Sequence, residues 1–147
     1  AARLGLSSLT VEERDASLPD AALFGACDRV ICDVPCSGFG VLAKKPELRY
    51  KNPESSASLP KIQRDILDNA CKYVKSGGIL LYSTCTIFPE ENEENIKSFL
   101  KDHPEFSLLP WHTENLSAES GMITLLPHVH GTDGFFIAKL VKLRKDK

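Results

Sequence analysis

The chain has 147 residues, of which 42% are hydrophobic and 26% charged, and its formal net charge is −2 at pH 7. This length and composition predict one globular domain, or part of a larger one, with enough apolar residues for a core. No apolar run approaches the roughly 18 residues that span a bilayer, and the first residues lack the pattern of a signal peptide. The charge excludes a basic surface over the whole chain, so any nucleic-acid contact must be local.

The cysteines indicate a reducing compartment. There are five, an odd number, whereas a secreted disulfide framework uses an even number in loop-rich sequence. Neither a Cys-x-x-Cys pair nor a cysteine–histidine spacing of the zinc type occurs, so we expect no metal site. We therefore predict a cytoplasmic protein that has no membrane segment.

The first half of the chain predicts two strands and a long loop. Residues 1–6 resemble the end of a helix closed by a glycine, and Ser8–Glu12 is a candidate strand that ends near Asp15. Arg29–Asp33 is almost entirely apolar, as expected of a strand covered on both faces. Residues 34–60 are rich in Pro, Gly, Ser and Lys, and a loop of this length is usually functional or mobile.

A helix and a strand follow. Apolar residues recur at a helical spacing over residues 61–74. Ser58 or Pro60 marks the start of this helix, and the glycine pair at 77–78 marks its end. The apolar run at 79–83 predicts a third strand.

The last third begins with an acidic helix over residues 90–100, whose first carboxylates suit the positive end of the helix dipole. Residues 106–109 are a candidate strand, an irregular stretch around Trp111 comes next, and 134–141 form the last strand. The alternation of strands and helices predicts an α/β fold with a mainly parallel sheet. The last strand follows a long irregular connection, so we expect it to be antiparallel.

Two cysteines follow predicted strands directly. Cys36 lies in Asp33-Val34-Pro35-Cys36-Ser37-Gly38, and Cys85 lies in Ser83-Thr84-Cys85-Thr86. Ligands of open α/β sheets bind outside the carboxyl ends of the strands, so both thiols should share one crevice. Each cysteine alone also fits a turn or a core position. The acid at Asp33 favours a functional site, because a charge at the end of a buried strand needs a partner or a ligand.

The remaining cysteines, Cys27, Cys32 and Cys71, have no such context and are predicted to be structural. An attacking thiolate needs a lowered pKa, which a helix N-terminus or a cation can supply. The start of the helix near Pro89 is close enough in sequence to Cys85 to contribute.

The two cysteine segments resemble the fourth and sixth motifs of the Sun (Fmu) family of S-adenosylmethionine-dependent RNA (cytosine-5)-methyltransferases. Supporting segments at 40–50, 89–92 and 133–138 occur in the same order, and the resemblance extends from Leu4 to Lys142. It is strongest to the bacterial branch that modifies small-subunit ribosomal RNA. The resemblance implies a Rossmann-like methyltransferase fold, S-adenosylmethionine as cofactor and RNA as partner. It favours 16S ribosomal RNA as the substrate and leaves transfer RNA as the alternative.

The resemblance also implies residue roles. Cys85 is the nucleophile that attacks carbon 6 of cytosine, and Cys36 assists proton removal and release of the product. Asp33 lies beside the cofactor, and Asp15 resembles the acid that contacts the adenosine end, although it also fits a turn. The basic loop residues Lys44, Lys45 and Arg49 are candidates for RNA phosphates, or simply part of a solvated loop.

The sequence departs from the family in two places. No Gly-rich cofactor loop is present, and Ala43-Lys44 stands where the family often has two arginines. We therefore expect residues 1–147 to be the C-terminal portion of the catalytic domain, without its first cofactor-binding strands. The open edge of such a sheet invites artefactual pairing with a second copy. Two alternatives remain: a non-catalytic methyltransferase-like module that binds RNA or protein, and a thiol redox protein that uses Cys36 and Cys85.

Overall fold

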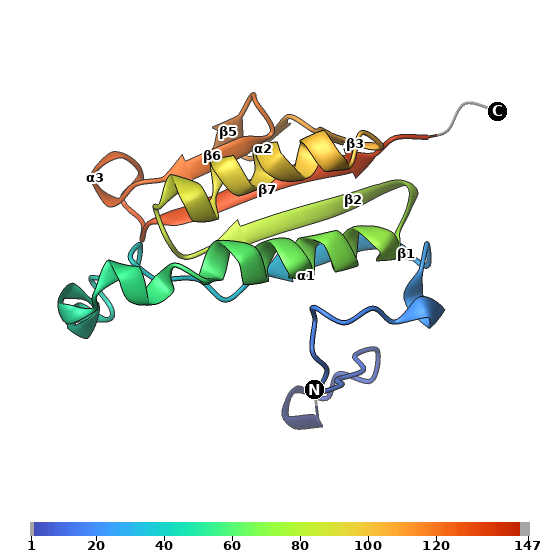
Figure 1. Cartoon of the computed structure of the whole chain (residues 1–147), viewed down its shortest axis with the longest axis horizontal. Coiled ribbons are helices and arrows are strands. Elements are labelled where there is room, and N and C mark those ends of the chain that lie inside the picture. The colour runs from blue at the N-terminus through green and yellow to red at the C-terminus, as the bar shows by residue number, and fades with distance from the viewer. Residues whose placement is uncertain (1, 145–147) are drawn as a thin grey trace.

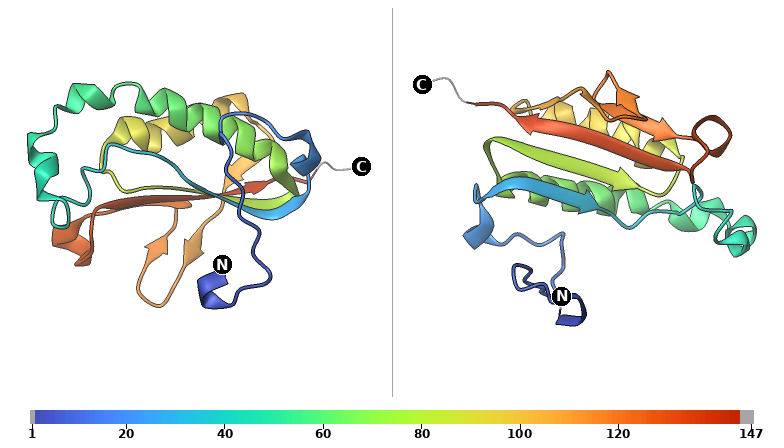
Figure 2. Two further views of the ribbon diagram at one scale, coloured as in Figure 1. Left: turned by 90° about the horizontal axis from the view of Figure 1, so that it is seen from below. Right: turned by 180° about the vertical axis from the view of Figure 1, so that it is seen from behind.

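The computed structural model describes residues 2–144 and shows two helices on one side of a five-stranded sheet (Figures 1 and 2). The strands are β1 (Cys27–Asp33), β2 (Val74–Thr84), β3 (Phe106–Leu108), β6 (Met122–Leu125) and β7 (Phe135–Lys142), with a separate hairpin of β4 (Trp111–His112) and β5 (Ser117–Ala118). The helices are α1 (Leu59–Tyr73), α2 (Glu93–Asp102) and the short α3 (Pro127–His130). Five 3-10 turns complete the described elements: η1 (Ala2–Leu4), η2 (Ala21–Leu23), η3 (Pro46–Tyr50), η4 (Pro53–Ser56) and η5 (Pro89–Glu91).

The sheet has the order β1-β2-β7-β3, and β6 pairs with β7 as well. β1 and β2 are parallel, with Asp33 opposite Ser83. The last strand β7 is antiparallel to β2, as the sequence predicts. β3 and β6 also run antiparallel to β7, so the antiparallel part of the sheet is larger than the sequence indicates.

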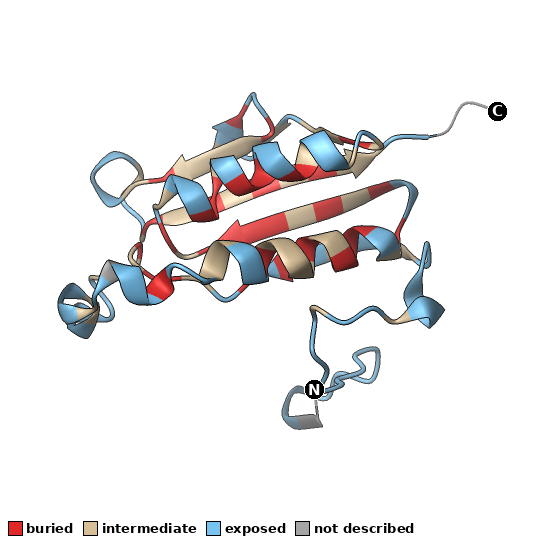
Figure 3. Cartoon of the chain, in the orientation of Figure 1, coloured by how far each residue is buried: buried red, intermediate tan, exposed pale blue. Residues whose placement is uncertain are grey.

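Alternation along the central strands builds the core. Leu80, Tyr82 and Thr84 of β2 are fully buried, and so are Phe136 and Leu140 of β7. These side chains meet the buried faces of the two helices, which both lie over this side of the sheet (Figure 3). The period of two along a strand therefore places every second residue in the core.

The opposite face of the sheet is less covered. Ile31, on the edge strand β1, is 71% exposed, and its sheet neighbour Leu81 is only half-buried. The prediction that Arg29–Asp33 is covered on both faces is therefore wrong for the described chain. Only one face of this strand is covered, where Val30 and Cys32 pack against the core.

α1 begins at one of its two predicted starts but ends earlier than predicted. Ser58 is its N-cap residue, and the helix ends at Tyr73, because Val74 takes an extended conformation and starts β2 at once. The glycine pair at 77–78 thus lies inside the strand, where Gly77 has a φ of 79°. The pairing between β1 and β2 shifts register opposite this point, as expected where a glycine with positive φ interrupts a strand.

The N-terminal segment differs most from prediction. η1 and a φ of 64° at Gly5 agree with a short helical turn closed by a glycine. No strand forms at Ser8–Glu12, where Leu9 and Val11 are 53% and 75% exposed. Among residues 2–144 this segment has no neighbouring strand, so its alternating pattern has neither a hydrogen-bonding partner nor a face to cover.

The acidic helix is also divided. η5 and α2 replace the single helix predicted at 90–100, and Glu91 is 2% exposed instead of lying at a solvated helix start. The predicted tail at 144–147 lies outside the described residues except for Arg144. No helix within residues 2–144 is long and apolar enough to cross a membrane, and the same residues contain no cluster of metal ligands.

Candidate active site

The structure brings the two predicted cysteines into direct contact. The Sγ atoms of Cys36 and Cys85 are 3.1 Å apart, and the backbone N–H of Cys85 donates to Cys36 Sγ at 3.2 Å. Both side chains are partly accessible. Two thiols from segments 49 residues apart in sequence therefore form one site.

Parallel strands explain this convergence. β1 and β2 end at the same edge of the sheet, and the ladder continues by one bond from Val34 N to Ser83 O at 3.3 Å. After each of these strands the chain turns away from the sheet, and the cysteine follows within three residues of the strand end. This is the carboxyl edge at which open α/β sheets bind ligands.

The environment of the Cys36 thiol favours its protonated form. Burial, together with the hydrogen bond to Cys85, raises the pKa of the Cys36 thiol well above its usual range. Cys36 therefore keeps its proton at neutral pH. A protonated thiol is a poor nucleophile but a suitable hydrogen-bond donor.

The three other cysteines fit their predicted structural positions. Cys32 and Cys71 belong to the core cluster, with 6% and 3% exposure, and burial raises the pKa of both thiols. Cys27 begins the edge strand β1. None of these three hydrogen-bonds to Cys36 or Cys85 among the described side chains.

Asp33 and Asp15 line two adjoining cavities. One, of about 340 Å³, is lined by Asp33 with Val30, Pro35 and neighbours, and the other, of about 510 Å³, contains Asp15. Ala16 and Tyr73 line both cavities. Asp33 is exposed and accepts a hydrogen bond from Ser83 Oγ at 3.2 Å. Its position at the strand end leaves the carboxylate free to accept from a ligand as well.

Asp15 is a turn residue in the structure. Its Oδ1 accepts from the backbone N–H of Ser17 at 2.9 Å and from Ser17 Oγ at 2.6 Å. These bonds lower the pKa of Asp15 and form an Asx-type turn. They fix the carboxylate at the cavity wall, so the turn and a ligand contact are compatible.

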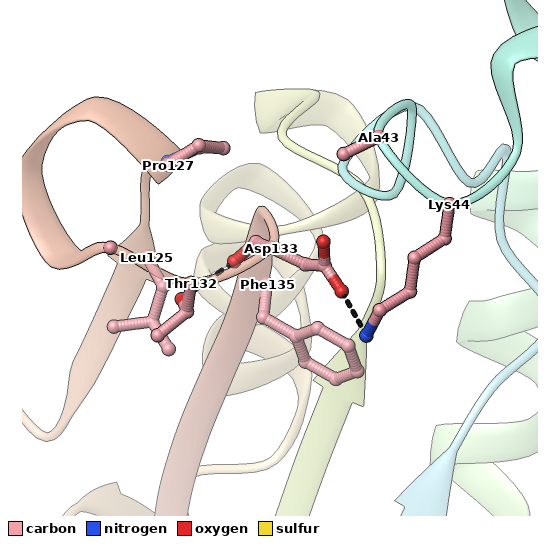
Figure 4. A pocket seen from close by; sticks show the side chains of 8 residues that line it. Ala43, Lys44, Leu125, Pro127, Thr132, Asp133 and Phe135 are labelled. Carbon is pink, nitrogen blue, oxygen red and sulfur yellow. Dashed lines mark hydrogen bonds and ion pairs between the residues drawn. The ribbon is translucent and has the colours of Figure 1, made fainter.

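The basic loop residues do not form one cluster. Lys44 pairs with Asp133 at 2.5 Å at the rim of a cavity of about 670 Å³, lined by Ala43, Leu125, Pro127 and Phe135 (Figure 4). Lys45 and Arg49 are exposed and make no ion pair with the described residues. Lys51, which the sequence did not single out, donates to Ser37 O at 3.3 Å.

The sequence assigned no role to three buried polar residues of this site, although two of them belong to the segment at 89–92 that supports the family resemblance. Gln63, Glu91 and Asn92 are each at most 2% exposed, and all hydrogen-bond to the segments that carry the cysteines. In the sequence, Gln63 looks like part of the solvated polar face of a helix, and Glu91 is one of several consecutive acidic residues. No local pattern distinguishes such residues from solvated ones.

Together, an α/β sheet and a pair of cysteines at the carboxyl edge of its parallel strands are the arrangement that the resemblance to an S-adenosylmethionine-dependent methyltransferase family implies. The chain belongs to the 16S rRNA methyltransferase RsmB/F family, whose sequence profile matches residues 1–141. Methyltransferases of this family use S-adenosylmethionine.

Relatives and solved structures agree with this assignment. The chain is 44% identical to the probable ribosomal RNA small subunit methyltransferase B of Synechocystis sp. and 42% identical to that of Bacillus subtilis. Each match covers 95% of this chain and 33% of the relative, so the chain spans about a third of the length of these relatives. The crystal structure of NSun6 from Pyrococcus horikoshii with SFG superimposes with a TM-score of 0.78 at 31% identity, covering 98% of this chain and 37% of that one.

Proposed function

We propose that the intact protein transfers a methyl group from S-adenosylmethionine to carbon 5 of a cytosine in RNA, with 16S ribosomal RNA as substrate. The observation that carries this proposal is the 3.1 Å contact between Cys36 and Cys85 at the carboxyl edge of β1 and β2. The names of the relatives support ribosomal RNA over transfer RNA. An enzyme that acts on this substrate works in the cytoplasm.

Cytosine requires covalent activation before methylation. Carbon 5 is a weak nucleophile, and the Cys85 thiolate overcomes this by adding to carbon 6. The new S–C6 bond moves the electron pair of the C5=C6 double bond onto carbon 5. S-adenosylmethionine, when bound, would supply the sulfonium methyl group that carbon 5 takes up, with S-adenosylhomocysteine as the leaving group. Removal of the C5 proton then re-forms the C5=C6 bond and expels the Cys85 sulfur.

Cys36 suits the release step. Its thiol lies against Cys85 Sγ, and its raised pKa keeps a proton on it at neutral pH. As the S–C6 bond breaks, that proton can pass to the departing sulfur of Cys85 while the C5 proton passes to the Cys36 sulfur, so both transfers belong to the same elimination. The contact between the two sulfur atoms, with a proton held on Cys36, therefore supports Cys36 as the group that assists release.

The described residues fit part of a cofactor site. Asp33 and Asp15 offer carboxylates in adjoining cavities, next to the strand end that precedes Cys36. Carboxylates at such positions suit the hydroxyl or amino groups of a nucleoside. The Gly-rich loop of the family is not in this sequence, so we assign cofactor binding to the intact protein.

RNA containing 5-fluorocytidine tests the reaction. Fluorine at carbon 5 blocks the final elimination, so the intact protein with S-adenosylmethionine should form a stable covalent complex, seen as a shifted band on a denaturing gel. Cys85→Ala should abolish this complex, whereas Cys36→Ala should retain it and accumulate a complex on unmodified RNA. A complex that survives Cys85→Ala refutes the assignment of the nucleophile.

A non-catalytic methyltransferase-like module that binds RNA or protein is the second candidate. It predicts that the intact protein binds RNA but neither S-adenosylmethionine, by calorimetry, nor fluorocytidine RNA covalently. Covalent capture would exclude this candidate.

A further inference from the structure

The residues on both sides of Cys36 are held by buried side chains. Gln63 Nε2 donates to the carbonyl oxygen of Pro35 at 3.0 Å, and Glu91 Oε2 accepts from the backbone N–H of Ser37 at 3.0 Å. Gln63 Nε2 also donates to Glu91 Oε2 at 2.7 Å, which joins the two contacts. Gln63 and Glu91 therefore bracket Cys36 from the core side.

Asn92 brackets Cys85 in the same way. Its Oδ1 accepts from Thr84 Oγ1 at 2.6 Å, and its Nδ2 donates to the carbonyl oxygen of Thr86 at 3.0 Å. Asn92 is the N-cap residue of α2, yet its side chain makes no capping bond to the helix. Asparagine at this position usually caps. Here its amide is used entirely on the cysteine segment.

Glu91 and Asn92 are both buried, so their polar groups would destabilise the fold if they made no hydrogen bonds. Glu91 is 2% exposed and Asn92 is fully buried. Glu91 makes no ion pair with any residue of the described chain. A buried carboxyl or amide group without hydrogen bonds destabilises the fold, so these bonds fix where the two segments lie.

We propose that Glu91 and Asn92 are positioning residues with separate tasks, Glu91 for Cys36 and Asn92 for Cys85. The proposal rests on the methyl transfer proposed above. Adjacent residues of one short turn thus set the placement of both thiols, and through it the order of attack and release.

This division predicts opposite kinetic defects for neighbouring substitutions. Glu91→Ala leaves Ser37 N–H without its acceptor and releases the Cys36 segment, so product release should slow about tenfold. The covalent complex then accumulates on unmodified RNA. Asn92→Ala releases the Cys85 segment, so the complex on fluorocytidine RNA should form about tenfold more slowly.

The experiment measures formation and decay of the covalent complex in the intact protein. Glu90→Ala is the matched control, because Glu90 is the same residue type, adjacent and exposed; it should behave as wild type. Glu91→Gln keeps an oxygen acceptor where Oε2 lies, so it should restore normal release. Glu91→Ala combined with Cys36→Ala should decay no more slowly than Cys36→Ala alone, because Glu91 acts through Cys36.

Several outcomes would overturn the positioning roles while leaving methyl transfer intact: equal defects in Glu91→Ala and Asn92→Ala, no rescue by Glu91→Gln, or additive effects of Glu91 and Cys36 substitutions. If Glu91→Ala fails to fold, Gln63→Leu tests the same bracket and should also accumulate complex on unmodified RNA. If Asn92→Ala fails to fold, Thr84→Val should slow complex formation. Absence of any complex with wild-type protein would instead refute the proposed function.

Discussion

Ser37 Oγ lies 2.8 Å from Thr86 Oγ1, so the residue after Cys36 hydrogen-bonds to the residue after Cys85. Both hydroxyl groups are buried. This bond links the two cysteine segments directly, in addition to their separate anchors in the core. The site is therefore held as one unit at the end of two parallel strands.

Thr86→Val should destabilise the protein by about 1–3 kcal/mol, because it leaves the buried Ser37 hydroxyl and the backbone N–H of Phe88 without their shared partner. Val matches the shape of Thr, so the change tests the hydrogen bond and not the packing. Adding Ser37→Ala should recover part of the loss, since both polar groups are then gone. Chemical denaturation of the three variants measures the effect, and additive losses would contradict it.

Gly40→Ala should disable the site without touching a cysteine. A Cβ on Gly40 would collide with the carbonyl oxygens of Gly134 and Cys85, the latter at 2.7 Å. The backbone N–H of Gly40 donates to Cys85 O at 3.0 Å, so the collision displaces the Cys85 segment directly. We expect loss of the covalent complex with fluorocytidine RNA, while far-ultraviolet circular dichroism stays close to wild type. Normal complex formation would show that this close approach is not required.

Mild oxidation should link Cys36 to Cys85. A peroxide oxidises one thiolate to a sulfenic acid, and the neighbouring thiol then displaces water to give a disulfide. Their sulfur atoms already touch, whereas Cys32 and Cys71 are buried in the core. Non-reducing peptide mass spectrometry should find this bridge, and covalent RNA capture should be lost until a reductant is added. Capture that persists in the bridged protein would contradict the need for free thiols.

Alkaline pH should destabilise the fold through buried thiols. Burial raises the pKa of Cys32 from 9.0 to about 12. Between these values the folded state binds more protons than the unfolded state, so the free energy of unfolding falls as the pH rises. Because of this thiol, we expect the free energy of unfolding to fall by about 1 kcal/mol over the first pH unit above the pKa of Cys32 in the unfolded chain.

Urea denaturation at increasing pH measures this loss. Other groups also ionise in this range, so the comparison that matters is with Cys32→Ala. That variant should be less stable at every pH, because it leaves a cavity, yet it should lose less stability on going alkaline. Identical pH dependence in the two proteins would contradict the role of the thiol.

Local patterns in the sequence predicted the elements that lie against the core. The apolar stripe over residues 61–74 and the run at 79–83 correspond to α1 and β2, and the antiparallel last strand corresponds to β7. Such patterns are local because a helix or strand repeats its buried face every few residues. No strand forms at the predicted Ser8–Glu12, because a period of two gives a strand only where a partner strand exists.

The residues of the candidate site also divide into those that the sequence predicted and those that only the structure revealed. The sequence by itself determined that Cys36 and Cys85 each follow a strand, and parallel pairing then required them to share one edge of the sheet. Only the tertiary structure decided that their sulfur atoms touch, that the Cys36 thiol has a raised pKa, and that Glu91 and Asn92 hydrogen-bond to the two segments. The contacts of Cys36 with Cys85 and of Ser37 with Glu91 join residues about 50 positions apart, whereas Asn92 lies only six and eight residues from its partners. Neither kind of hydrogen bond leaves a periodic trace in the sequence.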